Sequence, residues 1–444
     1  MSPWSQDATF YQIYPLGALG APERNPGGPP VPRLERLHGW LPALKNLGIT
    51  ALYLGPLFES TAHGYDTADY MQVDRRLGSN DDLAHLCAAA HAHGMRVVLD
   101  AVFHHVGRDF WAFRDVLARG SASPYAGWFH LDFQRRSPQG DPFFYEGWNG
   151  HYDLVKLDTS HPAVREHLFG AVNTWVDAFG IDGLRLDAAD VLDKEFQRAL
   201  AAHCKQLRPD FWLLGEVIHG DYRDWVNPGM LDAVTNYELY KGLYSSHNDR
   251  NYFEVAHSLN RQFGPGGLYQ DLTLYTFVDN HDVERIASQL KEAAHLYPLY
   301  TLLFTVPGIP SLYYGSEWGI EGRKAGHSDA PLRPAFSPAE GPRLGKHADL
   351  AAAIVRLSQI RSRHPALRHG TYRTLHVASE QFAFIRETPE ESIVVAVNAA
   401  SSPAELRLPL LESGRWTDLL NPGEGPSGET LTISPSWGRI LRAG

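Results

Sequence analysis

Short apolar runs alternate with amphipathic segments along most of the chain, from its start to about residue 365. The runs that favour strands lie at residues 8–14, 51–54, 96–103, 183–187, 211–217, 232–236, 272–279 and 311–315. Apolar positions at helical spacing predict helices at residues 34–47, 80–94, 162–179, 194–207 and 347–363. Strands that alternate with helices form a parallel sheet with crossover helices, and eight such units predict an α/β fold of the (β/α)8 TIM-barrel type.

Two parts of the chain depart from this alternation. Residues 104–156 are rich in aromatic residues, Gly and Pro but have no periodicity, which predicts an inserted subdomain after the third strand. Beyond residue 370, short β-type runs at 372–376, 382–386, 392–397, 405–408, 430–433 and 439–441 predict a C-terminal all-β sandwich domain. The expected domains are therefore a barrel (1–103 and 157–370), the inserted subdomain B (104–156) and the sandwich (371–444).

Composition and charge exclude several classes of protein. The 444 residues carry 40 Lys and Arg against 51 Asp and Glu, a net charge of −11, so nucleic acid is not an expected partner. The two cysteines, Cys87 and Cys204, lie in Ala-rich helical stretches and are interpreted as core residues. Residues 297–315 are apolar but broken by prolines, so we expect no membrane span. The N-terminus lacks the charged and apolar regions of a signal peptide, so we expect a cytoplasmic protein.

Charged side chains gather where the predicted barrel strands end, the face on which such barrels carry their active sites. Asp100 and His105 flank the end of the third strand, and Arg185 and Asp187 close the fourth. Further polar residues follow the fifth and seventh strands, namely Glu216, His281 and Asp282. A single Asp after a strand is usually a helix cap, but three carboxylates in one barrel mouth destabilise a fold and need a functional explanation. Arg185 precedes Asp187 by two residues, so both side chains point to one face of the strand.

Four ordered segments around these residues resemble the signature regions of the α-amylase superfamily, glycoside hydrolase family 13. They are DAVFHHVG (100–107), GLRLDAAD (183–190), GEVIHG (215–220) and FVDNHD (277–282). Further similarities are YQIYP (11–15), HGYDTADY (63–70) and GIPSLYYGSE (308–317). LVKLDTSHPAVREHL (154–168) resembles the fifth region of the neopullulanase and cyclomaltodextrinase branch. The resemblance runs in the family's order from residue 10 to about residue 335.

This resemblance implies catalytic roles for three residues. Asp187 is expected to be the nucleophile that forms a glycosyl-enzyme ester, and Glu216 the acid/base. Asp282 is expected to bind the distorted sugar and stabilise the oxocarbenium-like state. Together they imply a retaining double displacement.

The resemblance also implies a set of substrate-binding residues: Tyr65, Asp100, His105, Arg185, His281, Asp329 and Arg333. The two histidines would hydrogen-bond sugar hydroxyls, Tyr65 would stack under the same sugar, and Asp100 would mainly support Arg185. The pair at 329 and 333 would grip the next sugar on the non-reducing side. Taken singly, Tyr65 is more often a core residue and the pair at 329 and 333 a loop salt bridge.

Four positions depart from the family's usual pattern: His104, Asp190, Val191 and Ile218. His104 stands where the family usually has an Asn that helps to hold calcium, and calcium rarely accepts a nitrogen ligand. We therefore expect no metal and no cofactor. The other three positions are on the acceptor side, so acceptor preference stays open. We also expect the chain to begin at its barrel, without an N-terminal domain that mediates dimerisation, and we expect no obligate protein partner.

Three functions are compared on this basis. The leading hypothesis is a retaining α-glucan hydrolase that acts on α-1,4 links, with α-glucan oligosaccharides such as maltooligosaccharides or cyclodextrins as ligands. A transglycosylase or sugar isomerase stays open, because water and sugar acceptors share one covalent intermediate. A non-catalytic carbohydrate-binding relative is disfavoured, since such relatives typically lose catalytic carboxylates and this chain keeps all three.

Overall fold

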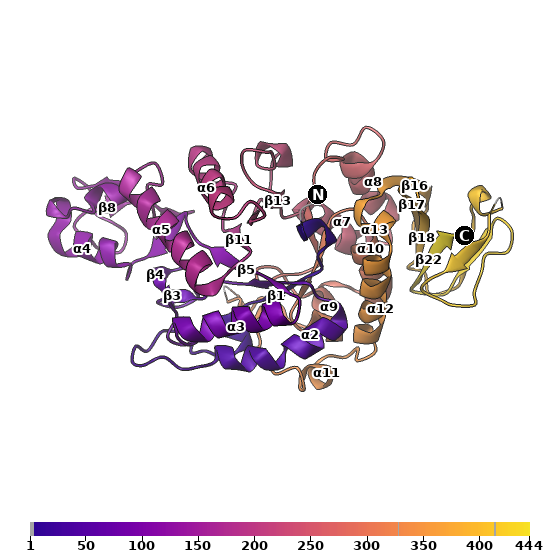
Figure 1. Cartoon of the computed structure of the whole chain (residues 1–444), viewed down its shortest axis with the longest axis horizontal. Coiled ribbons are helices and arrows are strands. Elements are labelled where there is room, and N and C mark those ends of the chain that lie inside the picture. The colour runs from indigo at the N-terminus through magenta and orange to yellow at the C-terminus, as the bar shows by residue number, and fades with distance from the viewer. Residues whose placement is uncertain (1–3, 327, 413) are drawn as a thin grey trace.

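The computed structural model, which describes residues 4–326, 328–412 and 414–444, has a parallel barrel at its centre (Figure 1). Its strands lie in the order β13-β12-β11-β5-β2-β1-β15-β14. Thr235, just after β13, forms a parallel bridge with Tyr275 of β14, and this bridge closes the barrel. The eight strands are β1 (Phe10–Ile13), β2 (Ala51–Leu54), β5 (Arg96–Ala101), β11 (Gly183–Leu186), β12 (Trp212–Gly215), β13 (Ala233–Val234), β14 (Tyr275–Phe277) and β15 (Ile309–Tyr313). The prediction of a TIM barrel is confirmed.

Helices cover the outside of the barrel, and their ends follow local sequence signals. Ser79 caps α3 by accepting a hydrogen bond from the main-chain N–H of Asp82, whose side chain bonds back to Ser79. Gly48 and Gly180 end their helices in the left-handed conformation, at φ +85° and +66°. The helices around the barrel are α2 (Leu41–Leu47), α3 (Asn80–Ala92), α5 (Pro162–Phe179), α6 (Lys194–Leu207), α7 (Tyr237–Asn248), α8 (Tyr252–Phe263), α9 (Ile286–Gln289), α10 (Leu296–Thr305), α12 (Leu350–Arg363) and α13 (Pro365–His369). The short helices α1 (Pro15–Ala18) and α11 (Gly341–Leu344) lie in loops.

Some elements differ from the sequence prediction. The helix expected over residues 34–47 is divided into a 3₁₀ helix, η2 (Leu34–Gly39), and α2, because Pro42 favours the first turn of a new helix. The strand expected at 311–315 begins two residues earlier, at Ile309. Helices α7, α8 and α10 were not predicted, and in α10 nine of the ten residues are buried, so it has no polar face that would reveal a helical period.

The insertion after the third strand forms a small mixed subdomain at one end of the molecule, where Figure 1 shows α4 and β8. Its elements are β6 (His105–Gly107), α4 (Trp111–Arg119), β7 (Leu131–Asp132), β8 (Phe144–Tyr145), β9 (Gly147–Trp148) and β10 (His151–Lys156). Strands β6 and β10 pair antiparallel, so the two ends of the insertion lie side by side against the barrel. A separate hairpin, β3 (Phe58–Ser60) and β4 (Thr67–Val73), follows the second barrel strand.

The C-terminal domain lies at the opposite end of the molecule (Figure 1). One sheet has the order β16-β17-β18-β22-β20, and β19 pairs with β21 in a second. Side chains from both sheets share one apolar core, which gives the predicted sandwich. Its strands are β16 (Thr371–Val377), β17 (Gln381–Glu387), β18 (Ser392–Asn398), β19 (Ala404–Arg407), β20 (Trp416–Asp418), β21 (Thr430–Ile433) and β22 (Trp437–Ala443).

Two buried arginines lie where this domain meets the barrel, and one of them, Arg386, donates hydrogen bonds across the boundary. Arg361 of α12 donates to the main-chain carbonyls of Phe304, Gly308 and Leu367. Arg386 of β17 donates to the Leu367 carbonyl from the other side, at 3.0 Å, and to three further carbonyls. Burial lowers the pKa of each guanidinium to about 9. The domain contact is therefore held by hydrogen bonds to backbone.

Two remaining sequence predictions concern the core and membranes. Cys87 and Cys204 are free and fully buried in α3 and α6, as predicted for core residues. Across the described residues, no helix combines the length and apolar character that crossing a bilayer requires.

Candidate active site

A single guanidinium group connects three carboxylates at the ends of neighbouring barrel strands. Arg185, in β11, is 3 % exposed and donates through Nη1 to Asp100 (2.8 Å) and to Asp187 (2.7 Å). Its Nη2 lies 2.9 Å from Oε2 of Glu216, which follows β12. The backbone turns sharply after Asp187, since Ala188 has φ +47°, and the Ala188 N–H donates to the same Glu216 oxygen at 3.1 Å. The neighbouring strands β5, β11 and β12 thus bring Asp100, Asp187 and Glu216 to one cation.

The electrostatics of this group favour retention of a proton. Burial raises the pKa of Asp187, and the charges of Glu216 and Asp100 add to this effect while Arg185 opposes it. Burial also raises the pKa of Glu216, and the negative charge of Asp282 adds to it. One guanidinium cannot neutralise three buried carboxylates, so the surroundings favour a proton on one member of the Asp187–Glu216 pair.

Asp282 has different surroundings. With 37 % of its side chain accessible, it is more exposed than Asp187 and Glu216. Its Oδ2 lies 2.9 Å from His281 Nε2, and its Oδ1 accepts from Arg333 Nη2 at 3.0 Å. Burial acts to raise the pKa of Asp282, but His281 and Arg333 outweigh it and hold that pKa well below its usual range. Its surroundings therefore favour the ionised form of Asp282. Arg333 also donates to Oδ2 of Asp329 at 3.1 Å, so the predicted 329–333 pair is formed.

Tyr65 joins the two halves of the site. Its hydroxyl donates to Oδ2 of Asp100 at 3.2 Å and also contacts Nε2 of His281. Its ring is parallel to the His281 ring, with centroids 5.5 Å apart and 12° between the planes. This aromatic face lies beside the carboxylates, and its predicted contact with a sugar stays a prediction.

His105 presents a free nitrogen to the site. Its Nε2 is buried, has no hydrogen-bond partner among the described residues, and lies 3.9 Å from Oδ2 of Asp187. Burial, together with neighbouring His104 and His63, lowers the pKa of His105 to about 3, so the ring is neutral. A neutral imidazole with an unused nitrogen beside Asp187 is suited to a sugar hydroxyl.

The structure places all ten sequence-predicted residues around one mouth, and it adds four that the sequence analysis missed. Gln12 Nε2 lies 2.8 Å from His281 Nδ1, and the Tyr53 hydroxyl donates to Asp100 at 2.7 Å. Asn280 donates to the hydroxyl of Tyr237 at 3.2 Å, and that hydroxyl lies 3.5 Å from Glu216. The sequence could have revealed Gln12, because it is a polar residue inside a strand that is buried on both faces.

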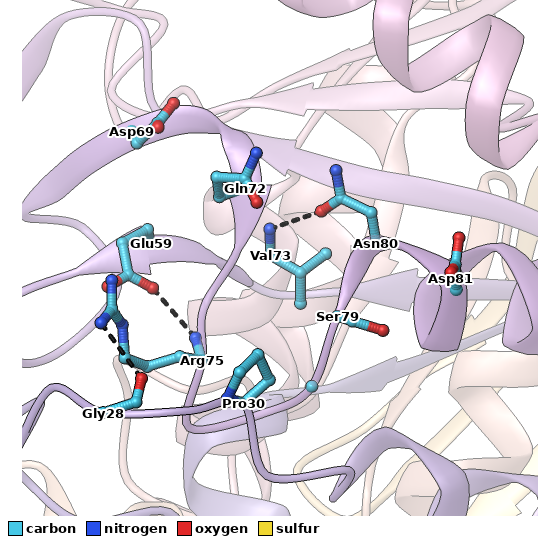
Figure 2. Close-up of a pocket in the computed structure, with 11 residues that line it drawn as sticks. Gly28, Pro30, Glu59, Asp69, Gln72, Val73, Arg75, Ser79, Asn80 and Asp81 are labelled. Carbon is cyan, nitrogen blue, oxygen red and sulfur yellow. Dashed lines mark hydrogen bonds and ion pairs between the residues drawn. The ribbon is translucent and has the colours of Figure 1, made fainter.

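In the part of the chain that the structure covers, neither a metal-binding cluster nor the cavity described here coincides with this site. The described residues contain no group of three or more His, Cys, Asp or Glu placed to hold a metal ion. A cavity of about 440 Å³ lies between the β3–β4 hairpin and the start of α3 (Figure 2). It is lined by Gly28, Pro30, Glu59, Asp69, Gln72, Val73, Arg75, Gly78, Ser79, Asn80 and Asp81, none of which contacts Arg185. Its Glu59 carboxylate is occupied by Arg75, 2.6 Å away, and no aromatic ring lines it.

Comparison with known protein families decides the classification. Residues 37–369 match the model of the α-amylase catalytic domain, and residues 372–435 match that of the maltogenic amylase C-terminal domain. This chain belongs to the α-amylase family. It is a glycoside hydrolase of that family, as the resemblance implied, and the bonds that such enzymes hydrolyse are those of α-glucans.

Relatives of this α-amylase-family enzyme include hydrolases of the predicted branch. A cyclomaltodextrinase from a Bacillus species is 34 % identical over 91 % of this chain and 75 % of its own length. Neopullulanase 2 from Thermoactinomyces vulgaris is 32 % identical over 99 % of this chain and 78 % of its own length. The structure of the cyclic α-maltosyl-(1→6)-maltose hydrolase from Arthrobacter globiformis superimposes with a TM-score of 0.83 at 26 % identity, over the whole of both chains.

Proposed function

We propose that this enzyme hydrolyses α-1,4-glucosidic bonds in maltooligosaccharides and cyclodextrins by a retaining double displacement. The observation that carries the proposal is the contact of one guanidinium group, that of Arg185, with both Asp187 and Glu216. Retaining enzymes hold their two carboxyl groups about 5–5.5 Å apart, whereas inverting enzymes leave about 6.5–9.5 Å for a water molecule. Carboxylates that touch the same guanidinium group suit the shorter separation.

In the first step, Asp187 attacks the anomeric carbon while Glu216 protonates the leaving oxygen. Asp187 keeps its charge because Arg185 donates to it directly at 2.7 Å. The proton of this pair resides on Glu216 in the reactive state, because that carboxyl also faces the ionised Asp282. A neutral carboxylic acid with a raised pKa is what general-acid catalysis near neutral pH requires.

The other site residues act on the sugar. Asp282 accepts hydrogen bonds from ring hydroxyls and stabilises the positive charge that develops on the sugar in the transition state. His105 offers its unused Nε2, and the ring of Tyr65 supports the apolar face of the pyranose. In the second step, Glu216 takes a proton from the incoming water and the ester of Asp187 is cleaved.

The proposal of short or cyclic glucans as substrates rests on the relatives, whose names include cyclomaltodextrinase and neopullulanase. A further relative, from Bacillus subtilis, is named intracellular maltogenic amylase, and we extend its location to this chain as part of the proposal. The barrel (1–103 and 157–370), subdomain B (104–156) and sandwich (371–444) are proposed as the domains that build the enzyme.

Product analysis tests this function. The purified protein is incubated with maltoheptaose, β-cyclodextrin, pullulan, sucrose, trehalose and raw starch, and products are separated by chromatography. We expect maltooligosaccharides and cyclodextrin to be cleaved faster than raw starch, and proton NMR to show that the first product has the α configuration. A β-configured first product would refute the retaining mechanism. Sugar products longer than the substrate, or maltose converted to trehalose, would favour the transglycosylase or isomerase instead.

A further inference from the structure

The segment that carries Asp282 is closed into a ring by a side chain that the proposed mechanism does not use. Residues 279–286, here called the Asp282 loop, run from the end of β14 to the start of α9. Oδ2 of Asp279, at one end of the loop, accepts a hydrogen bond of 2.9 Å from the main-chain N–H of Ile286, at the other end. Asp279 is buried, so its carboxylate cannot contact a substrate in the barrel mouth.

The same carboxylate oxygen fixes the loop to the neighbouring barrel strand. It accepts a second hydrogen bond, of 2.7 Å, from the hydroxyl of Ser316, the first residue of η7 (Ser316–Trp318) after β15. Arg285 provides a parallel attachment, because it donates to the carbonyls of Tyr314 (2.8 Å) and Leu332 (3.1 Å). One carboxyl oxygen thus holds two donors, the Ile286 N–H and the Ser316 hydroxyl, in place relative to each other.

Hydrogen bonds within the Asp282 loop connect its fixed ends to Asp282 and His281. Oδ1 of Asn280 accepts from the main-chain N–H groups of Asp282 (2.8 Å) and Val283 (3.1 Å), which fixes the turn at Asp282. Arg333, which directly follows Leu332, donates to the carbonyl of His281 at 3.0 Å as well as to Asp282. The orientation of Asp282 and His281 thus depends on where the loop is held.

A buried carboxylate at position 279 costs stability, which calls for a functional reason. Burial raises the pKa of Asp279, and Arg285 opposes this rise. Oδ1 of Asp279, Nη2 of Arg285 and Oε2 of Glu317 are all buried without a hydrogen-bond partner among the described residues. An apolar side chain at position 279 would remove the unsatisfied Oδ1, but it could not close the loop.

We propose that Asp279 is a positioning residue of this site: it closes the Asp282 loop, fixes it to the end of β15 and so holds Asp282 and His281 at the reacting sugar. The proposal rests on the function proposed above, because it assigns Asp279 a role in the same reaction.

Three variants test the proposal. Asp279→Ala removes both hydrogen bonds, Asp279→Asn can keep its oxygen in place of Oδ2, and Ser316→Ala removes only the attachment to β15. Ser358→Ala is the matched control, because that buried hydroxyl donates to the Gly48 carbonyl far from the site. Each variant is assayed for kcat and KM on maltoheptaose from pH 4 to 9, and its melting temperature is measured.

We expect Asp279→Ala to lower kcat by up to about a hundredfold while KM changes little, the scale on which small misplacements act. The acid limb of its kcat/KM profile should move to higher pH, because Asp282 is then less firmly held by the cations that lower its pKa. Asp279→Asn should retain kcat within about threefold of wild type, Ser316→Ala should lie between them, and Ser358→Ala should keep the wild-type pH profile.

A folded Asp279→Ala variant with wild-type kcat and pH profile would overturn the proposal. So would an Asn variant as impaired as the Ala variant. Should Asp279→Ala not fold, Ser316→Ala decides, because unchanged kcat and pH profile after loss of that hydroxyl also overturn it. A wild-type protein inactive on every glucan would instead refute the proposed function.

Discussion

Replacement of Arg185 by Lys tests the electrostatic arrangement of the site most directly. The guanidinium makes three short contacts, to Asp100, Asp187 and Glu216, at 2.8, 2.7 and 2.9 Å. An ammonium group is a point charge on a flexible stem, so it can keep about one of these contacts. Each hydrogen bond to a charged group contributes about 1.5–3 kcal/mol, so the loss of two predicts a destabilisation of about 3–6 kcal/mol. This agrees with the cost of about 3–5 kcal/mol for breaking a buried ion pair.

The pH dependence of this destabilisation is its distinguishing feature. Without Arg185, the folded-state pKa values of Asp187 and Glu216, already raised, rise further above those of the unfolded chain. A group with a raised folded-state pKa stabilises the fold at low pH, and this contribution is lost as pH rises through that pKa. The variant should therefore lose less stability at pH 5 than at pH 8. Its kcat at pH 7 should fall by at least about a hundredfold, equivalent to about 2.7 kcal/mol, because the group that orients the nucleophile and favours its ionised form is lost.

Urea unfolding at pH 5, 6.5 and 8, together with kcat on maltoheptaose, measures both effects. The matched control is Arg323→Lys, which alters an arginine 62 % exposed and paired with Glu284 at the surface. Its stability should change by no more than about 0.5 kcal/mol at any pH. An equal loss of stability for Arg185→Lys at pH 5 and pH 8, or a kcat within tenfold of wild type, would refute the reasoning.

Three further predictions follow from the site and its surroundings. Asp187→Asn and Glu216→Gln should each abolish turnover of natural glucans, while their melting temperatures stay near that of the wild type. The Gln variant should retain more activity on substrates with good leaving groups. An Asp187→Asn enzyme whose activity is within tenfold of wild type would contradict the mechanism. Burial raises the pKa of Glu317 to about 7. Between pH 4.5 and 8 the wild-type protein gives up that proton, so its free energy of unfolding should fall by up to about 3 kcal/mol relative to that of Glu317→Gln. Free energies of unfolding that change in parallel with pH in the two proteins would argue against this. Dialysis against a chelator should leave activity and melting temperature unchanged, because His104 offers a ring nitrogen where calcium prefers oxygen; activity lost and then restored specifically by calcium would count against this.

The barrel was predictable because each strand is a short apolar run with a clear boundary. β2 (Ala51–Leu54), α5 (Pro162–Phe179) and α6 (Lys194–Leu207) have the predicted bounds, since Gly, Pro and capping residues mark their ends. Helix α10 could not be found in this way, because contact with both the barrel and the sandwich buries it on all sides. Strand β20 has only three residues, too few to establish an alternation.

The site was predictable to the extent that its residues lie at strand ends. Asp187 and Glu216 stand at the ends of apolar runs, and Asp282 follows Val278 after three polar residues, so their positions indicate a common mouth. Gln12 and Tyr53 lie within strands and reach the site only because the barrel brings β1, β2 and β5 together. Contacts of this kind depend on the register of neighbouring strands, which no local pattern in the sequence specifies.

The two arginines between the barrel and the sandwich affect how this interface can change during evolution. Arg361 and Arg386 donate to main-chain carbonyls, and both reach the carbonyl of Leu367. Every amino acid supplies a carbonyl, so the residues that accept these bonds can be exchanged while the bonds themselves persist. The two arginines cannot be exchanged in this way, since only a planar guanidinium group donates hydrogen bonds to several carbonyls at once. Sequence drift should therefore be tolerated at the acceptor positions and rejected at the two arginines, so that a sandwich domain with an arginine in the place of Arg386 can be attached to barrels whose acceptor side chains differ.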